Sequence, residues 1–310
     1  MRVCFVGIGS IAKRHIKNLR AVCLERNINL SIDALRRKSS TSKVPEEVMN
    51  IYTSPEEMPR NYDVIFLTNP TEYHADMLIK LHDYARHFFV EKPITSYETI
   101  DKLEHFIPRA ESVYYIACPL RYTSVIQYLK ENIDIESVNC VRSISSSYLP
   151  DWRPGVDYRN TYSAHKALGG GVEIDLIHEW DYLVYMFGMP NEIQSFAGKV
   201  SNLEIDSNDY AVYIAKYNNM IVELHLDYFG KKNIRKIEIF TDDDTIIGDF
   251  IRGEIRYINS NKTVNLYEER DEYQKREMRC FIDIINMNME SQNSIDEAIN
   301  ILKLTKGVIG

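Results

Sequence analysis

Three ionisable side chains stand three residues apart in one apolar segment of the sequence. Asp175, His178 and Asp181 follow the glycine run 169–171, and a helix through them would place all three on one face. The remainder of this predicted helix is mostly apolar, which indicates burial. Buried ionisable groups are costly unless they pair or take part in chemistry. The segment is therefore a candidate catalytic site.

Two further polar segments each follow an apolar run that predicts a strand. Thr68–His74 comes after the strand expected at Asp63–Leu67, and Glu91-Lys92-Pro93 comes after the strand expected at Phe88–Val90. In a doubly wound sheet, ligands bind outside the carboxyl ends of the strands. Both segments are therefore candidates for ligand binding.

The first fifteen residues join a strand to a helix through a glycine turn. The run 3–6 is apolar without alternation, as in a central parallel strand. Gly7 and Gly9 occupy the first two positions of G-x-G-x-x-G, and Ala12 takes the third, where a small residue lets helix and strand pack closely. This pattern predicts a dinucleotide pyrophosphate at the helix N-terminus. An ordinary strand-to-helix turn is the alternative interpretation.

Strand and helix signals alternate through the first part of the chain and then change. We expect parallel strands at Arg2–Gly7, Leu30–Leu35, Asp63–Leu67, Phe88–Val90 and Val113–Ala117. Capping boxes at Ser54–Glu57 and Thr95–Glu98 predict helix starts. Alternation of this kind predicts an α/β fold with a doubly wound parallel sheet.

From about residue 192, strands follow one another without intervening helices. Residues 222–228 alternate between apolar and polar side chains, and turns are predicted at Tyr217–Met220 and Thr241–Asp244. Helices are expected over Glu268–Met289 and from Ser294 to the C-terminus. The second fold class is therefore α+β, with an open, mostly antiparallel sheet. We place the domains at 1–120 and 121–310, and the C-terminal helix could pack back on the first domain.

Composition excludes several classes of protein. The net charge of −8 argues against a nucleic-acid-binding surface. No stretch approaches the ~20 apolar residues of a membrane span. The five cysteines lack the paired spacing of a disulfide framework or a zinc site. Residues 13–15 are basic and follow the first apolar run without a cleavage pattern, so a secretory signal is rejected. We expect a cytoplasmic protein without a metal.

Four motifs in order resemble one known family over nearly the whole chain. These are GxGxxA, Glu91-Lys92-Pro93, Arg121 within CPLRY, and the glycine run leading to Asp175 and His178. They resemble the Gfo/Idh/MocA family of NAD(P)-dependent oxidoreductases. The resemblance implies a Rossmann domain and an open-sheet domain that mediates a homodimer or homotetramer. It also implies an enzyme acting on CH–OH groups of sugars, cyclitols or sugar nucleotides.

The resemblance also assigns catalytic roles. Lys92 would be a catalytic lysine that touches substrate and the nicotinamide ribose, and His178 would be the general acid/base. An imidazole with a reference pKa of about 6.5 suits proton exchange near neutrality. Asp175 would orient His178, but this chain has two residues between them where the family commonly has three, so Asp181 is an alternative. A buried, hydrogen-bonded histidine and a surface ion pair are the non-catalytic interpretations of His178 and Lys92.

Cofactor choice depends on the end of the second strand, where NAD-binding sites carry an acidic residue. This chain has Arg36 and Arg37 after Leu35, and both could bind a 2′-phosphate. The sequence therefore favours NADP. Asp33 keeps NAD open if the strand ends earlier, and a solvated loop is the other interpretation of the basic run.

A loop beyond the first domain carries the remaining candidates. By resemblance, Trp152 and Arg153 would contact cofactor and substrate, and Asp157, Tyr158 and Arg159 would contact substrate together with Asp175 and His178. The full set expected to bind the dinucleotide is Gly7, Gly9, Ser10, Ile11, Arg36, Arg37, Thr68, Asn69, Pro70, His74, Glu91, Lys92, Arg121, Trp152 and Arg153.

The segment resembles family members of bacterial surface-polysaccharide pathways, which favours an acidic or nucleotide-activated sugar as substrate. Two other functions stay open. One is a non-catalytic NAD(P)-binding sensor or corepressor, although Lys92 and His178 are intact. The other is an enzyme with tightly bound NAD that uses transient oxidation to drive elimination or hydrolysis.

Overall fold

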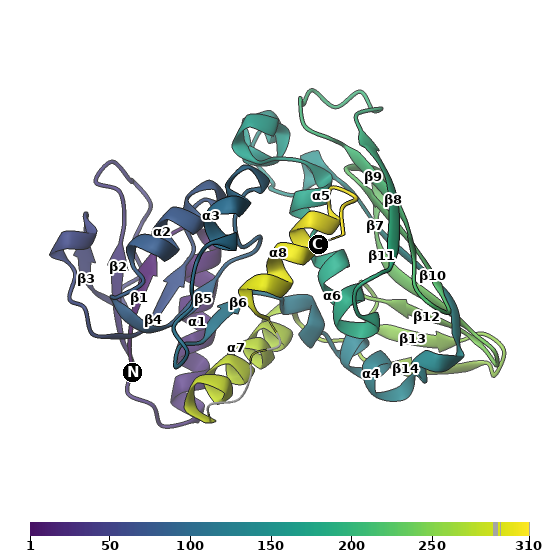
Figure 1. The fold of residues 1–310 in the computed structure, drawn as a ribbon, viewed down its shortest axis with the longest axis horizontal. Coiled ribbons are helices and arrows are strands. Elements are labelled where there is room, and N and C mark those ends of the chain that lie inside the picture. The colour runs from purple at the N-terminus through teal and green to yellow at the C-terminus, as the bar shows by residue number, and fades with distance from the viewer. Residues whose placement is uncertain (288–290, 292, 310) are drawn as a thin grey trace. The chain divides into compact units, whose positions relative to one another are not determined.

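The structure is a computed structural model that describes residues 1–287, 291 and 293–309. By its contacts, the chain divides into two compact units (Figure 1). The first is residues 1–117 with 270–299, and the second is residues 118–269 with 300–310. The domain boundary at residue 120 remains a prediction; residues 270–299 group with the first unit. No helix in the described residues is long and apolar enough to cross a bilayer.

The first unit contains a parallel sheet of six strands in the order β3-β2-β1-β4-β5-β6, which is the Rossmann order. Its strands are β1 Arg2–Val6, β2 Ser31–Leu35, β3 Val48–Tyr52, β4 Tyr62–Leu67, β5 Ala85–Val90 and β6 Tyr114–Ile116. The expected doubly wound sheet is confirmed. The sequence did not predict β3, because it is an edge strand whose central residues are exposed and show no apolar alternation.

The helices of this unit are α1 Ser10–Glu25, α2 His74–Lys80, α3 Ile100–Glu104 and α7 Arg270–Met287. Of the helix predicted over Glu268–Met289, the last two residues lie outside those described. Helix α7 runs beside α1 (Figure 1), and Lys17 on α1 donates to Asp271 on α7 over 2.6 Å. The Phe281 ring of α7 packs edge-on against Phe89 of β5 at 5.2 Å between ring centroids. The C-terminal helix prediction corresponds to α8 Ile295–Leu304.

The two predicted capping boxes have different outcomes. The box of Ser54 and Glu57 forms, but it starts only a single 3-10 turn, η1 Pro55–Glu57. The turn ends because Met58 precedes Pro59, whose ring disfavours the helical region, and Met58 takes ψ 144°.

The second predicted box is wrong. Ser96, not Thr95, precedes the next 3-10 turn, η3 Tyr97–Thr99, and no side chain caps it. The Thr95 hydroxyl instead bonds the Thr99 hydroxyl over 2.6 Å.

The second unit contains a sheet of eight strands in the order β14-β13-β12-β11-β7-β10-β9-β8. Its strands are β7 Val138–Tyr148, β8 Glu192–Gly198, β9 Tyr210–Lys216, β10 Ile221–Asp227, β11 Phe229–Thr241, β12 Thr245–Asp249, β13 Glu254–Tyr257 and β14 Lys262–Asn265. Its neighbouring strands are antiparallel except for β7 and β10, so the expected mostly antiparallel sheet is confirmed. Both predicted turns close hairpins, with Tyr217 N donating to Met220 O and Thr241 N to Asp244 O.

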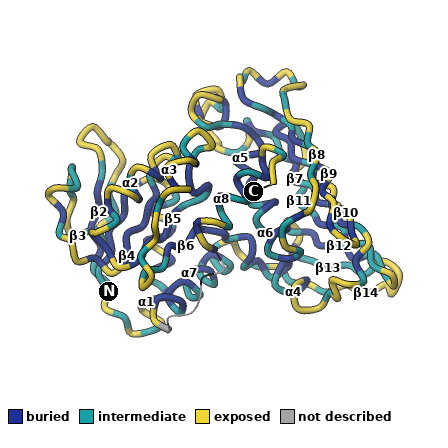
Figure 2. The backbone as a smooth tube through the Cα atoms, viewed as in Figure 1, coloured by how far each residue is buried: buried dark blue, intermediate teal, exposed yellow. Residues whose placement is uncertain are grey.

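Strand β7 lies near the middle of this sheet, although little in the sequence indicates it. Its inward-facing positions include Ser143 and Ser145, which are buried. The Ser143 hydroxyl lies 2.6 Å from the Tyr182 hydroxyl. Buried serines that are hydrogen-bonded replace the apolar alternation on which strand prediction depends. Figure 2 shows buried residues within both sheets.

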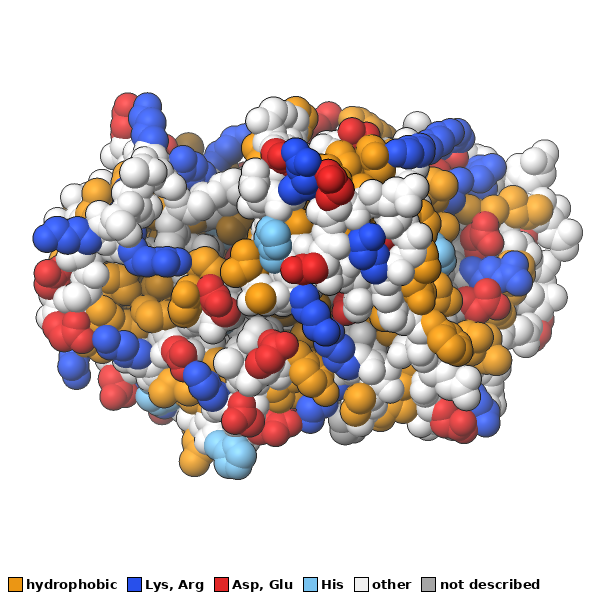
Figure 3. All heavy atoms as spheres, turned by 90° about the horizontal axis from the view of Figure 1, so that it is seen from above, with side chains coloured by type: hydrophobic (Ala, Val, Ile, Leu, Met, Phe, Trp, Pro, Cys, Tyr) orange, Lys and Arg blue, Asp and Glu red, His pale blue; other side chains and the backbone are white. Residues whose placement is uncertain are grey.

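The helices of the second unit include α4 Ser124–Asn132, α5 Val172–Asp175 and α6 His178–Phe187. The single helix predicted through Asp175, His178 and Asp181 is therefore wrong, because the chain leaves the helical region at Leu176, with φ −99° and ψ 23°. Asp175 ends α5 and His178 begins α6. On the face drawn in Figure 3, charged side chains of both signs are interspersed with hydrophobic ones.

Candidate active site

The turn after β1 is built so closely that only glycine fits at its first position. Gly7 has φ +86°, and a Cβ there would lie 2.9 Å from the Asn69 Cα. The Gly7 N–H donates to the Leu35 carbonyl over 2.8 Å. The Thr68 hydroxyl lies 2.8 Å from the Gly7 carbonyl and donates to it. These contacts fix the carboxyl ends of β1, β2 and β4 together, at the point where the strand order reverses.

The residues after this turn fit a dinucleotide pyrophosphate. Gly9 precedes α1, no side chain caps that helix, and no acidic residue lies in its first turn, which contains Ser10 and Ile11. A Cβ on Gly9 would meet nothing within 4 Å. Nearby, the buried Asn69 Oδ1 has no hydrogen-bond partner in the described part of the chain. An uncapped N-terminus of a 16-residue helix beside open space favours a phosphate.

His74 connects the two loops that follow β4 and β5. Its ring is buried, with Nε2 2.9 Å from the Asn69 carbonyl and Nδ1 3.0 Å from the Pro93 carbonyl. Burial lowers the pKa of His74, and the two carbonyl oxygens oppose that shift. His74 thereby holds the Asn69 loop against the Lys92-Pro93 turn, and its predicted contact with the cofactor stays a prediction. The peptide bond between Lys92 and Pro93 is cis.

Glu91 pairs with the buried His15, a contact that the sequence did not indicate. Glu91 accepts hydrogen bonds from the His15 ring and from the Lys92 N–H at 3.2 Å. Burial by itself raises the pKa of Glu91, but the hydrogen bond and charge of His15, with the charge of Lys92, outweigh it, so the net pKa is lowered. His15 was missed because a histidine on an apolar helix stripe is usually a core residue. Its signal was its place one turn after Ala12.

The end of β2 corrects one cofactor expectation. Asp33 is fully buried inside the strand and accepts from Arg2 at 2.9 Å, Asn50 at 2.7 Å and the Tyr62 hydroxyl at 2.8 Å. The structure therefore leaves Asp33 no ribose-binding role, because its buried carboxylate already accepts hydrogen bonds from three donors. The strand ends at Leu35, as the sequence predicted.

The basic loop after β2 is shaped by its own arginines. Arg36 donates to the carbonyls of Ser40 and Ser42, the latter over 2.9 Å. The Arg37 guanidinium lies 5.4 Å from the centre of the Tyr73 ring, which belongs to the loop after β4. Arg36 thus folds the loop, and Arg37 is exposed beside the segment 68–74 that the sequence singled out.

In the second unit, Asp175 is held by a tyrosine that the sequence did not single out. The Tyr228 hydroxyl donates to Asp175 Oδ2 over 2.5 Å. Burial and the charge of Asp175 raise the pKa of Tyr228 well above its usual value, so it remains a donor. The Trp152 ring meets the Tyr228 ring edge-on at 5.2 Å, and its Nε1 donates to Ser147 over 2.9 Å. Tyr228 continues the apolar alternation of β10, which gave it the appearance of a core residue.

A second tyrosine, Tyr162, links Arg153 to Asp175. Partial desolvation and the negative charge of Asp175 raise the pKa of Tyr162, which is 44% exposed. The Arg153 guanidinium lies 5.4 Å from the centre of the Tyr162 ring. Trp152, Arg153 and Asp175, which the sequence placed in one site, are thus brought together by Tyr228 and Tyr162. We call these five residues the Asp175 cluster.

Asp181 belongs to a different pair. Arg121 donates from Nε to one Asp181 oxygen over 3.0 Å and from Nη2 to the other over 2.8 Å. Arg121 is buried, and its guanidinium lies 5.2 Å from the centre of the Tyr185 ring. Both Asp181 oxygens therefore accept from Arg121, and which of the two acids supports His178 stays a prediction.

The remaining predicted substrate residues form an exposed cluster of their own. Arg159 donates to Asp157 and to Glu204, each over 2.8 Å. The Tyr158 hydroxyl accepts the Glu204 N–H over 3.1 Å. Their substrate role stays a prediction. No group of three or more His, Cys, Asp or Glu residues within the described ranges could hold a metal ion.

The glycine turn and the strand order define the class of NAD-binding Rossmann proteins. The chain matches the family model "Oxidoreductase family, NAD-binding Rossmann fold" over residues 1–117 and "GFO/IDH/MocA C-terminal domain" over residues 126–247. The chain therefore belongs to the Gfo/Idh/MocA family.

Individual relatives are more distant. The chain is 24% identical over 196 residues to myo-inositol 2-dehydrogenase of Thermotoga maritima, covering 61% of this chain and 55% of the relative. It is 23% identical over 207 residues to scyllo-inositol 2-dehydrogenase (NAD(+)) of Bacillus subtilis, covering 64% and 56%. These matches span about half the length of the curated relatives.

Solved structures share the fold over nearly the whole chain. A myo-inositol 2-dehydrogenase from Lactobacillus plantarum has TM-score 0.77 at 19% identity, covering 99% of this chain and 95% of that one. A levoglucosan dehydrogenase in complex with NADH has TM-score 0.83 at 15% identity, with the same coverage.

Because Glu91 pairs with His15, the difference in stability between wild type and Glu91→Gln should depend on pH. The folded pKa of Glu91 is lowered, so its carboxylate stabilises the fold above its ordinary pKa, and this contribution is lost as pH falls through the lowered value. Glu91→Gln should reduce the free energy of unfolding by roughly 1–3 kcal/mol at pH 7. The difference from wild type should shrink below about pH 4. Urea unfolding measures it, with the exposed Glu98→Gln as control; a difference that is independent of pH would contradict the assignment.

Alanine should affect different properties at the two glycines: mainly stability at Gly7 and mainly dinucleotide binding at Gly9. Gly7→Ala should cost roughly 2–3 kcal/mol of unfolding free energy, because φ is positive and backbone blocks the Cβ. Gly9→Ala should cost under about 1 kcal/mol. It should nevertheless weaken dinucleotide binding about tenfold or more, since its methyl group would occupy the phosphate position. Denaturation and calorimetric titration separate the two; wild-type NADP⁺ affinity in Gly9→Ala would exclude the proposed phosphate position.

Proposed function

We propose that this chain is an NADP(H)-dependent dehydrogenase that interconverts a hydroxyl and a carbonyl on a sugar or a nucleotide-activated sugar. The observation that carries the proposal is the glycine turn between β1 and α1, fixed to the end of β4 and open at Gly9. When bound, the nicotinamide dinucleotide supplies the hydride acceptor or donor. The family, and relatives named as inositol dehydrogenases, support an alcohol as the other reactant.

Two side chains are proposed to act on the substrate. Lys92 follows β5, and its backbone N–H is fixed by the Glu91 carboxylate. Its ammonium group would bind the reacting oxygen and the nicotinamide ribose. His178, at the start of α6, would take the hydroxyl proton during oxidation and return it during reduction. Asp175 would orient His178, and the Tyr228 hydroxyl limits the positions that the Asp175 carboxylate can take.

The Asp175 cluster also supports the substrate class. It presents an indole, the Tyr162 ring and the Arg153 guanidinium, which are side chains that bind sugar rings and anionic groups, whereas Tyr228 is fully buried. An acidic or nucleotide-activated sugar would use both kinds of contact. We propose a place in bacterial surface-glycan synthesis on the same ground. A UDP-N-acetylglucosamine 3-dehydrogenase from Acidithiobacillus ferrooxidans shares the fold at TM-score 0.72 and 17% identity, covering 99% of this chain and 95% of that one.

Self-association through the second sheet is also proposed. Phe196, Ile214 and Ile221 are 72%, 51% and 41% exposed. The strand register places all three on the same face of β8, β9 and β10. Apolar side chains gathered on one sheet face favour burial against a second copy of the chain.

Substitution of the two proposed catalytic residues tests the reaction. Lys92→Ala and His178→Ala should each abolish turnover while changing cofactor affinity only a few-fold, because neither removes the phosphate site. Lys102→Ala and His165→Ala are matched controls, since these residues pair at the surface of their own units with Asp76 and Asp206. Turnover is followed by nicotinamide absorbance with free and nucleotide-activated sugars. Full activity in both catalytic variants would refute the proposal.

The preference for NADP is tested by the arginines after β2. Arg37→Ala should weaken NADP⁺ about tenfold and leave NAD⁺ within twofold, because only NADP⁺ carries the 2′-phosphate. Arg36→Ala should act in the same direction and also loosen the loop that it holds. Lys38→Ala, which removes an exposed charge from the same loop, is the control. Equal affinity for both dinucleotides, unchanged in these variants, would contradict the preference.

A further inference from the structure

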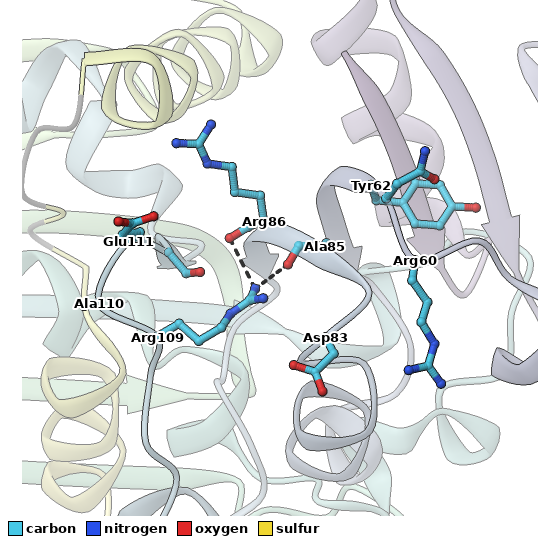
Figure 4. Close-up of a pocket in the computed structure, with 10 residues that line it drawn as sticks. Arg60, Tyr62, Asp83, Ala85, Arg86, Arg109, Ala110 and Glu111 are labelled. Carbon is cyan, nitrogen blue, oxygen red and sulfur yellow. Dashed lines mark hydrogen bonds between the residues drawn. The ribbon is translucent and has the colours of Figure 1, made fainter.

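A pocket lies at the amino ends of the strands of the parallel sheet, whereas the glycine turn lies at their carboxyl ends. It is formed where β4, β5 and β6 begin, within the first unit, and has a volume of about 490 Å³ (Figure 4). Its lining residues are Arg60, Asn61, Tyr62, Asp83, Ala85, Arg86, Arg109, Ala110, Glu111 and Ser112. Ligand pockets in proteins commonly have volumes of about 300–1,000 Å³, so the space suits a small organic molecule.

The charged side chains that line this pocket are not joined to one another in ion pairs. Arg60, Arg86 and Arg109 form no ion pair in the part of the chain that the structure describes, and neither do Asp83 and Glu111. Other arginines of the same unit are paired: Arg2 with Asp33, Arg20 with Glu47, and Arg26 with Asp283. Three guanidinium groups against two carboxylates leave the pocket with a positive balance.

Two of the arginines are held in place but keep hydrogen-bond donors. The Arg109 Nη2 group donates to the carbonyls of Ala85 and Arg86, as the dashed lines in Figure 4 show, while its buried Nε has no partner among the described residues. The Arg60 guanidinium lies 4.7 Å from the centre of the Tyr84 ring. In Figure 4, the Asp83 carboxylate lies between these two arginines in the view, and the Arg86 side chain extends in another direction.

The positive charge of the pocket helps to lower the pKa of a neighbouring histidine, His87. Burial, together with the charges of Arg86 and Arg109, lowers the pKa of His87 to about 4, although Asp63 opposes the shift. The His87 Nδ1 accepts the Val113 N–H over 3.1 Å, just ahead of β6. An anion bound at this edge would therefore change the surroundings of a single buried imidazole.

We propose that this pocket binds a small organic phosphate, with the phosphoryl group on Arg60 and Arg109 and ligand hydroxyl groups on Asp83 and Glu111. Guanidinium groups with free N–H donors match phosphate oxygens, and carboxylates accept hydrogen bonds from hydroxyl groups. A sugar phosphate carries both kinds of group. This site is separate from the proposed reaction and does not depend on it.

Glucose 6-phosphate is the probe, titrated into protein that is saturated with NADP⁺ so that the dinucleotide site is filled. Calorimetry should give saturable binding, and the imidazole signals of His87 should shift in NMR spectra with the same midpoint. Arg60→Gln should weaken binding about tenfold or more, the loss of one charge-assisted contact, and Arg60→Lys should weaken it less. Arg109→Gln should act in the same direction. Arg20→Gln, the same charge change on α1, should leave binding unchanged.

Asp83→Asn distinguishes binding of the phosphoryl group from binding of the ligand hydroxyl groups. It should tighten inorganic phosphate, because a negative charge is removed, and weaken glucose 6-phosphate, because a hydroxyl acceptor is lost. Tightening of both would overturn the hydroxyl role. Absence of binding at millimolar concentration, binding without a shift of His87, or binding that is lost in Lys92→Ala would overturn the site itself, since the last two outcomes place the ligand elsewhere.

Discussion

The first unit depends on the close approach of the Gly7 backbone to the Asn69 backbone. A single added carbon at Gly7 would lie 2.9 Å from Asn69 Cα, so the turn after β1 and the loop after β4 can meet only because one of them lacks a side chain. That contact sets the crevice at which the strand order reverses. The uncapped start of α1, the Asn69 amide and the basic loop after β2 all take their positions from it.

A chain of polar contacts then extends from this crevice to the proposed catalytic lysine. His74 holds the Asn69 loop to the Pro93 carbonyl, and His15 on α1 holds Glu91, whose carboxylate accepts the Lys92 N–H. Both histidines are buried, so each would be costly without its partners. Two histidines that do not touch substrate in this proposal thus keep Lys92 beside the dinucleotide crevice. Rigid support of this kind is what catalysis by positioned groups requires.

In the second unit, a tyrosine hydroxyl holds the carboxylate that is proposed to take part in catalysis. Helix α5 ends at Asp175 and α6 begins at His178, so the two residues stand at the ends of separate helices. Asp175 is then fixed by the Tyr228 hydroxyl, while Asp181 is committed to Arg121. The Tyr228 hydroxyl thereby limits the positions open to the carboxylate that is proposed to orient His178.

The sequence by itself determined the two sheet types, the dinucleotide turn and the candidacy of Lys92, Asp175 and His178. Glycine spacing predicted the turn because only small residues permit close backbone approach, and the alternation at 222–228 predicted β10, whose apolar positions are indeed buried. Only the tertiary structure decided that β7 is a strand with buried serines and that Asp33 is a buried structural acid. It also showed that His15 and His74 hold the neighbouring loops in place. In the second unit, it placed Tyr228 and Tyr162 beside Asp175. The physical reason is that periodicity and steric exclusion act over a few residues. The hydrogen bond between His15 and Glu91 joins residues 76 positions apart, and no local pattern specifies such a partner.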